Sequence, residues 1–168
     1  MEKEWILYCT GVVPAISSIV RKMTEIGDDI VVLAPVYNIF YNSILNNGRK
    51  VLASELRYAD GSYTIDYADL EEKLSRETTS LFIFCNPHNP IGKVWDRPML
   101  ERIAELCIKH DVLVVSDEIH CDLTHFGHAY IPFASLSQEI ADRTISCIAP
   151  TKTFNIAGLQ TAAIVISN

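Results

Sequence analysis

Short runs of β-branched and aromatic residues alternate along the chain with stretches whose apolar residues recur at helical spacing. Several of the runs are apolar nearly throughout, which is typical of strands covered on both faces of a sheet. Seven strands are predicted, at residues 5–9, 29–34, 50–53, 80–85, 112–116, 144–148 and 162–166.

Three helices are predicted between these strands. Residues 14–26 place their large apolar residues on one side and precede Gly27, a residue type favoured just past a helix end. Asp66 is a predicted N-cap of a helix that runs to residue 74, and Asp96 of a helix over residues 98–110.

Strands that alternate with helices are joined by right-handed crossovers and form a mainly parallel sheet. We therefore predict an α/β fold, a three-layer α/β/α sandwich with a mainly parallel seven-stranded sheet. No internal repeat, low-complexity tract or linker interrupts the pattern, so residues 1–168 are interpreted as one domain. Residues 58–62 are predicted to form a surface turn around Gly61.

Polar residues are concentrated just after the predicted strands, where sites gather in sheets of this kind. Five such positions follow the first, second, fourth, fifth and sixth strands. They are Thr10 and Gly11, Tyr37, residues 86–89, residues 117–120, and Thr151 with Lys152. We expect these residues to converge on one rim of the sheet.

The composition excludes several classes of protein. Hydrophobic residues make up 49% and charged residues 21% of the chain, as in a folded domain with a sizeable core. A formal net charge of −7 disfavours nucleic acid and anionic membrane surfaces as partners. No apolar stretch approaches the length of a membrane span, and residues 1–5 do not resemble a signal peptide.

The five cysteines are odd in number, never spaced C-x-x-C, and mostly lie inside apolar runs. A disulfide framework or thiolate metal site is therefore disfavoured, and a reducing, cytoplasmic location is expected. His120, Asp122, His125 and His128 cluster in sequence, but they lack the spacing of a helical metal motif, so no metal site is predicted.

Asp117 and Lys152 each follow an apolar run, which leaves two interpretations open. They could form a structural ion pair at the edge of the sheet. Alternatively, partial desolvation could lower the pKa of the lysine and make its neutral amine a nucleophile for a carbonyl.

Two other segments are also ambiguous. The two Asn-Pro pairs of residues 86–90 form either a rigid turn or a rigid support that holds an Asn amide toward a ligand. Residues 10–13 open a helix directly after a strand and form either an ordinary turn or a phosphate site. The fingerprints of dinucleotide and nucleoside triphosphate sites are missing from the sequence.

Three strings in this order, CNPHNPIGKVW, VVSDEIHCDL and APTKTFNIAGLQ, resemble the fold-type I pyridoxal-phosphate enzymes. The likeness runs from Thr10 to the end of the chain. NPHNP, DEIH and KTFN are most similar to the cystathionine β-lyase-like branch of the class I/II aminotransferase family, which includes the maltose-regulon modulator proteins. The resemblance implies pyridoxal 5′-phosphate as cofactor and the large domain of a PLP-dependent transferase as fold.

The resemblance also implies roles for individual residues. Lys152 matches the lysine that joins the cofactor covalently and moves the α-proton, and Asp117 matches the carboxylate beneath the pyridine nitrogen. Asn89 matches the residue that hydrogen-bonds the phenolic oxygen, and Tyr37 the aromatic that stacks on the ring. The phosphate is expected at Gly11, Val12 and Val13, with a hydroxyl from Thr151.

The sequence departs from the family in two positions and in length. His120 stands where many aminotransferases have Tyr, with an expected contact to the ring oxygen, and Ala149 stands where some relatives have a phosphate-binding Ser. Relatives are about twice as long. Residues 1–168 therefore resemble the cofactor-binding large domain without the N-terminal segment and the C-terminal small domain, which supplies the arginine for the substrate carboxylate.

Three functional hypotheses follow from the resemblance. The first is a carbon–sulfur β-lyase acting on cystathionine or cysteine conjugates, and the second is an aminotransferase that uses the same residues. The third is an inactive cofactor-domain fragment, and if residues 1–168 are the whole molecule we expect weak cofactor binding and almost no turnover. A homodimer acting on a small-molecule amino-acid substrate is expected, without nucleic acid or membrane partners.

Overall fold

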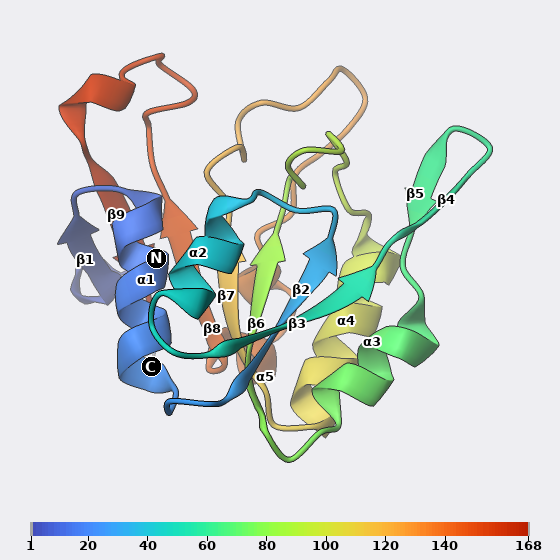
Figure 1. The fold of residues 1–168 in the computed structure, drawn as a ribbon. Coiled ribbons are helices and arrows are strands. Elements are labelled where there is room, and N and C mark those ends of the chain that lie inside the picture. Colours follow the sequence, from blue (N-terminus) through green and yellow to red (C-terminus); the bar gives the residue numbers. More distant parts are fainter. Residues whose placement is uncertain (1, 168) are drawn as a thin grey trace.

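The computed structural model describes residues 2–167 and contains a seven-stranded sheet in the order β1-β9-β8-β7-β6-β2-β3 (Figure 1). The strands are β1 (Ile6–Cys9), β2 (Asp29–Ala34), β3 (Lys50–Glu55), β6 (Thr79–Cys85), β7 (Leu113–Asp117), β8 (Thr144–Ile148) and β9 (Ala162–Val165). The five strands from β8 to β3 are parallel, whereas β9 is antiparallel to both of its neighbours. The predicted seven-stranded, mainly parallel sheet is confirmed, with strand ends that differ by one or two residues.

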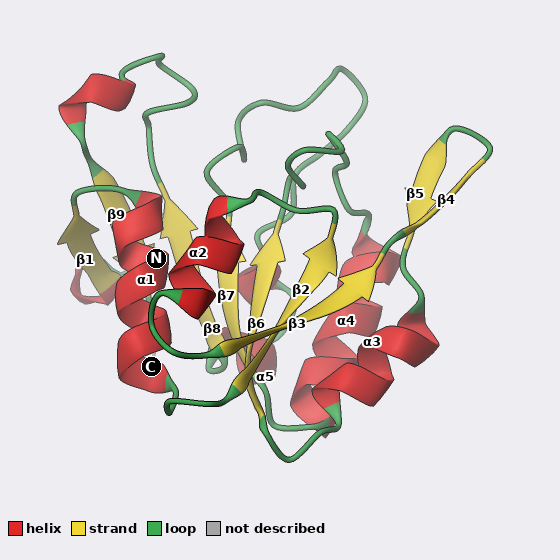
Figure 2. Cartoon of the chain, viewed as in Figure 1, coloured by secondary structure: helices red, strands yellow, loops and turns green. Residues whose placement is uncertain are grey.

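Helices cover both faces of this sheet (Figure 2). The helices α1 (Val12–Met23) and α2 (Ile39–Leu45) pack on one face, and α3 (Tyr67–Leu74), α4 (Arg97–Lys109) and α5 (Gln138–Ala141) pack on the other. Successive side chains of β2 point to opposite faces of the sheet, so the core has two halves. Ile30 and Val32 pack on the side of α1, and Val31 and Leu33 pack on the side of α4. The predicted three-layer α/β/α arrangement is therefore confirmed.

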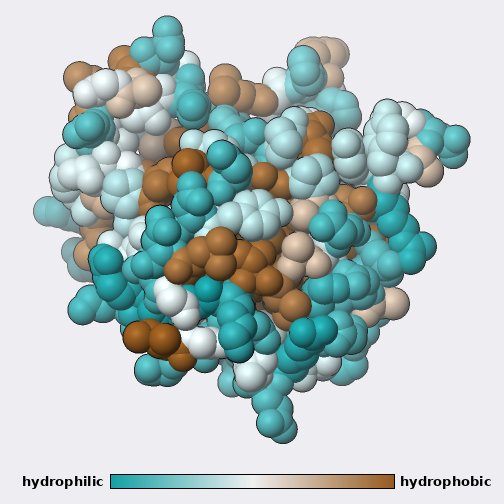
Figure 3. Space-filling view, viewed as in Figure 1, coloured by the Kyte–Doolittle hydropathy of each residue, from teal (hydrophilic) through white to brown (hydrophobic). Residues whose placement is uncertain are grey.

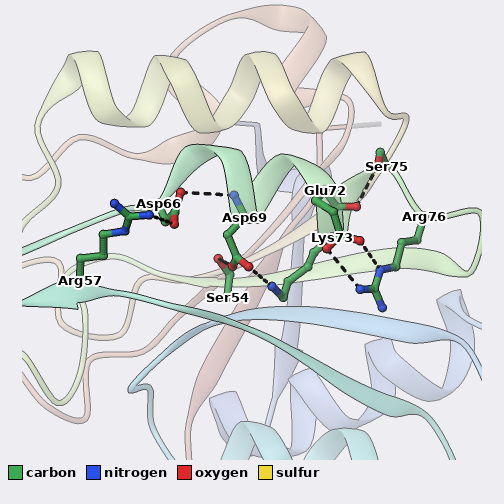
Figure 4. Close-up of polar contacts among 8 residues, drawn as sticks. All are labelled: Ser54, Arg57, Asp66, Asp69, Glu72, Lys73, Ser75 and Arg76. Carbon is green, nitrogen blue, oxygen red and sulfur yellow. Dashed lines mark hydrogen bonds and ion pairs between the residues drawn. The ribbon is translucent and has the colours of Figure 1, made fainter.

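Both predicted N-caps are found. The Asp96 side chain accepts a hydrogen bond from the Met99 N–H at 3.0 Å, and the Asp66 side chain accepts one from the Asp69 N–H at 3.3 Å. Figure 4 shows that Asp66 also pairs with Arg57, while Asp69 bonds Lys73 and accepts the Ser54 hydroxyl at 2.6 Å. The bond from Ser54 fastens the first turn of α3 to β3.

Helix α1 ends earlier than the sequence predicts. It stops at Met23, and Gly27 lies in the following turn with φ of 95° instead of capping the helix. The Thr24 hydroxyl bonds the Val20 carbonyl at 2.6 Å, and the buried Arg49 guanidinium donates to the Arg21 and Thr24 carbonyls. The last carbonyls of the helix are thus satisfied by side chains, which ends the helix before Gly27.

Three features were missed by the sequence reasoning: a β-hairpin, helix α2 and the four-residue helix α5. The predicted surface turn at residues 58–62 is the tip of a hairpin formed by β4 (Arg57–Ala59) and β5 (Ser62–Thr64), in which Asp60 and Gly61 both have positive φ. Helix α2 was also missed, because only three of its seven residues are buried and no periodic pattern can develop over so short a length. The described part of the chain also contains three single-turn 3-10 helices: η1 (Lys3–Trp5), η2 (Phe133–Ser135) and η3 (Ala157–Leu159).

The described surface is mixed in character. Figure 3 shows a hydrophobic area in the middle of a largely hydrophilic face. Among residues 2–167, no helix combines the length and the apolar character that crossing a bilayer requires. The outer strand β1 exposes three large apolar side chains, Ile6, Leu7 and Tyr8.

Candidate active site

The polar residues that follow the strands meet around one cavity of about 260 Å³ at the carboxyl rim of the sheet. All nine residues predicted for the site line it: Gly11, Val12, Val13, Tyr37, Asn89, Asp117, His120, Thr151 and Lys152. They come from the ends of five different strands and the segments that follow them, and the parallel order of β2, β6, β7 and β8 brings these segments to one edge. The expected convergence is therefore confirmed.

Asp117 is a nearly dry carboxylate at the end of β7. It is 5% exposed, and its Oδ1 accepts a hydrogen bond from the Ile119 N–H at 3.1 Å. Burial raises the pKa of Asp117 to about 7, and the negative charge of Glu118 also raises it, whereas the Ile119 N–H and the Lys152 ammonium lower it. A cation or an N–H donor in the cavity would satisfy this carboxylate.

Lys152 lies in a tight loop after β8. The loop is closed by hydrogen bonds from the Phe154 N–H to the Pro150 carbonyl and from the Ile156 N–H to the Thr151 carbonyl, both at 3.0 Å. The ion pairs described within residues 2–167 do not include Asp117–Lys152. The arrangement therefore differs from the simple structural ion pair that the sequence left open.

The start of α1 forms the opposite wall of the cavity. Gly11 is the N-cap and brings no side chain, and the first helical hydrogen bond runs from the Ala15 N–H to the Gly11 carbonyl at 3.1 Å. The N–H groups of Val12 and Val13 therefore have no partner within the helix, and they suit an anion. A Cβ at Gly11 would lie 3.3 Å from Cδ of Pro14, so a larger residue would crowd this turn.

The two Asn residues of the Asn-Pro repeat have different surroundings. Asn86 is fully buried, accepts the Trp95 N–H at 3.4 Å and donates to the Ile131 carbonyl at 3.1 Å. Asn89 instead lines the cavity, as does Tyr37, whose ring meets Phe40 edge-on at 6.0 Å. The repeat is thus both a rigid turn and a support that presents one amide to the cavity.

His120 is half-buried beside Lys152. Burial lowers the pKa of His120, and the positive charge of Lys152 lowers it further. Within residues 2–167, no group of three or more His, Cys, Asp or Glu side chains is arranged to hold a metal ion, so the cluster from His120 to His128 does not assemble into one.

Sequence reasoning missed several residues of the cavity wall. Gln160 and Thr161 line the cavity although they precede a strand. Because β9 is antiparallel, its first residue lies at the rim where the other strands end. The sequence offers one indication, the two polar residues Gln160 and Thr161 directly before the last apolar run. These residues can be assigned to the rim only when the direction of β9 is known.

A second cavity of about 600 Å³ lies beside the first. It is enclosed by the β4–β5 hairpin, residues 87–94 and the segment from His120 to His128. Asn89 and His120 line both cavities, so the second is a continuation of the candidate site along the rim.

The residues of the first cavity fit a phosphorylated nitrogen heterocycle. A buried carboxylate, a primary amine and unpaired N–H groups at a helix start surround it, and together they suit a ring nitrogen, an aldehyde and a phosphate. Pyridoxal 5′-phosphate has these three groups.

Comparison with known proteins identifies the class. The chain belongs to the aminotransferase class I and II family, which matches residues 1–168. It is 53% identical over 163 residues to cystathionine beta-lyase PatB of Bacillus subtilis, covering 97% of this chain and 42% of PatB. It is 32% identical to protein MalY of Escherichia coli, over all of this chain and 42% of MalY.

A solved structure shares the fold closely. Cystalysin from Treponema denticola, which contains a pyridoxal 5′-phosphate cofactor, superposes with a TM-score of 0.99 at 41% identity, over 100% of this chain and 43% of that one. The chain thus spans about two fifths of the length of the relatives that it matches.

Proposed function

We propose that the protein of which these 168 residues are part or all is a carbon–sulfur β-lyase that depends on pyridoxal 5′-phosphate. Its substrate would be cystathionine or another cysteine conjugate, converted with one water into a thiol, pyruvate and ammonia. The observation that carries the proposal is the single cavity that holds Asp117, Lys152 and the start of α1 together. The identity of 53% with cystathionine beta-lyase PatB supports the lyase reaction in particular.

In this proposal Lys152 is the catalytic residue. Its Nζ would hold the cofactor through the aldehyde group and, once the substrate amine has taken its place, would accept the proton from Cα of the substrate. The bound cofactor supplies a protonated pyridine ring that accepts the electron pair left at Cα. Loss of the thiolate from Cβ would complete the elimination. The His120 imidazole lies near enough to Lys152 for the positive charge of that lysine to lower the pKa of His120.

Asp117 would keep the pyridine nitrogen protonated. Its burial favours this, because a nearly dry carboxylate with a raised pKa is stabilised by a cationic N–H partner. Asn89 would donate to the phenolic oxygen and Tyr37 would cover the ring. The phosphate would bind the N–H groups of Val12 and Val13, next to Gly11, with the Thr151 hydroxyl as a further donor.

We propose further that residues 1–168 are the cofactor-binding large domain of a cytoplasmic homodimer. The relatives are more than twice as long, and no Arg lines the described cavity to bind a substrate carboxylate. The apolar side chains that β1 exposes are consistent with a covering segment or subunit. Sedimentation of the full-length protein gives the oligomeric state directly.

The experiment that tests the proposed function measures products without a keto acid. The protein is produced in the longest form that its gene encodes, loaded with cofactor and given cystathionine. We expect pyruvate and ammonia in equal amounts, and neither from the Lys152→Ala variant. Turnover only when a keto acid is added would instead establish the aminotransferase, and no turnover under either condition would establish an inactive cofactor domain.

A further inference from the structure

His88 stands between the two Asn-Pro pairs and is 1% exposed. Its Nε2 lies 2.9 Å from the carbonyl oxygen of Pro35. Because a carbonyl only accepts hydrogen bonds, Nε2 must carry the hydrogen, and His88 is the neutral Nε2–H tautomer. The other ring nitrogen, Nδ1, is buried and has no hydrogen-bond partner within residues 2–167.

This hydrogen bond joins two loops that the sheet does not hold together. The ladder between β2 and β6 ends at the pair Val32–Ile83. Beyond that point β2 continues alongside β3, and β6 continues alongside β7. The His88 side chain therefore bridges the ends of two adjacent strands after their backbone pairing has stopped.

The imidazole ring is held firmly in this position. The His88 N–H donates to the Lys93 carbonyl at 2.7 Å, and the His88 carbonyl accepts the Gly92 N–H at 2.8 Å, so the loop closes on itself. The fully buried Trp95 ring meets the imidazole edge-on at 5.6 Å. Burial lowers the pKa of His88, so the ring stays neutral and keeps its donor near neutral pH.

The two bridged loops carry two of the side chains that line the cavity. Pro35 lies two residues before Tyr37, and His88 directly precedes Asn89. We propose that His88 is a positioning residue, whose bond to the Pro35 carbonyl fixes the separation of Tyr37 and Asn89 across the cofactor ring. This inference rests on the proposed function, because it assigns Tyr37 to the ring face and Asn89 to the phenolic oxygen.

The test compares His88→Leu with His88→Gln in the full-length protein loaded with cofactor. Leucine fills much of the space without a donor, whereas the Gln side-chain amide can place an N–H near the position of Nε2. The pH titration of the cofactor absorbance and the cofactor dissociation constant are measured. A displaced Asn89 amide stabilises the ionised phenolic oxygen less, so the titration midpoint rises.

For His88→Leu we expect a midpoint raised by about one pH unit and a dissociation constant raised about 10-fold, since one lost hydrogen bond is worth roughly that factor. We expect His88→Gln to restore both values to within about 2-fold of the parent. The control is His110→Leu, at the end of α4 and not among the residues that line the cavity, and it should leave both values unchanged. A His88→Leu protein that is less stable to heat but keeps the parent's midpoint and affinity would show a merely structural role and overturn the inference.

A second measurement does not depend on any variant. Nitrogen-15 chemical shifts of the parent should show the Nε2–H tautomer of His88, and an Nδ1–H tautomer would overturn the inference. A failure of the proposed cofactor dependence looks different, because the parent itself would then bind no cofactor. That result would overturn both proposals. If the parent binds the cofactor and His88→Leu titrates as the parent does, only the positioning role of His88 is overturned.

Discussion

Asp117 is the last residue of β7, Lys152 follows the adjacent parallel strand β8, and the two line the same cavity without forming one of the described ion pairs. The ammonium of Lys152 lowers the pKa of Asp117, yet burial raises that pKa more strongly. The negative charge of the Asp117 carboxylate is thus only partly balanced by other groups of the protein. In the proposed enzyme, the pyridine nitrogen of the cofactor completes this arrangement.

The pH dependence of stability tests the burial of Asp117. Its pKa is about 7 in the folded protein, against about 3.9 for an unfolded aspartate. Between these two pH values the Asp117 carboxyl is protonated in the folded state and ionised in the unfolded state. The free energy of unfolding that this proton contributes is therefore present at low pH and is lost as the pH rises from about 4 to about 7. From pH 5 to pH 8, the cofactor-free parent should lose roughly 2 kcal/mol more unfolding free energy than Asp117→Asn.

Urea unfolding at the two pH values gives this difference. The lowered pKa values of His88 and His120 act in the opposite direction near pH 6, but they are common to both proteins and cancel in the comparison. The exposed Asp142→Asn variant is the matched control and should follow the parent. Identical pH dependence of the parent and Asp117→Asn would contradict the burial described for this carboxylate.

Glu118 anchors the long segment that follows β7. Its carboxylate accepts hydrogen bonds from the Ser116 hydroxyl at 2.8 Å, the Phe133 N–H at 3.1 Å and the Tyr130 hydroxyl. Glu118→Ala leaves these buried donors unsatisfied and should lower the unfolding free energy by about 3 kcal/mol. Tyr130→Phe removes one donor and should lower it by about 1 kcal/mol.

Hydrogen exchange locates the effect of the Glu118 substitution. The Phe133 amide should exchange faster in Glu118→Ala and stay protected in Tyr130→Phe. If Glu118→Ala unfolds at the same urea concentration as the parent, then the carboxylate does not carry the anchoring role assigned to it.

Arg49 secures the end of α1 away from the cavity. Its guanidinium bonds the Thr24 hydroxyl at 2.9 Å and the carbonyls of Arg21, Thr24 and Asn47. Arg49→Ala should lower the unfolding free energy by about 2 kcal/mol, because these buried acceptors lose a charged donor. Arg21→Ala, at an exposed position of α1 itself, should change it by less than about 0.5 kcal/mol in the same denaturant titration. Equal losses in the two variants would refute the capping role.

Much of this fold is readable in the sequence because the central strands are buried on both faces. Their near-continuous apolar runs, such as residues 80–85, predict strands. The polar residues that follow each run predict the carboxyl rim of the sheet. A parallel arrangement then brings Tyr37, Asn89 and Asp117 together without further information. The N-caps Asp66 and Asp96 were predictable for a similar reason, since capping depends on a few neighbouring residues.

Features that depend on distant partners were not predictable. The end of α1 is set by Arg49, which lies far from Thr24 in the sequence but bonds it in the fold. Gln160 enters the cavity only because β9 runs antiparallel. Both Asn residues of the repeat directly precede a Pro, and the hydrogen bonds of Asn86 with Trp95 and Ile131 distinguish its structural position from that of Asn89.

The most direct test of the central claim is to find where the cofactor attaches. The full-length protein is incubated with pyridoxal 5′-phosphate, reduced with borohydride, digested and analysed by mass spectrometry. We expect the added mass on Lys152, an absorbance band that disappears in Lys152→Ala, and a turnover at least about 1000-fold lower in that variant. The exposed Lys22→Ala variant should match the parent in all three respects. Stoichiometric labelling of another lysine, with Lys152 unmodified, would contradict the account.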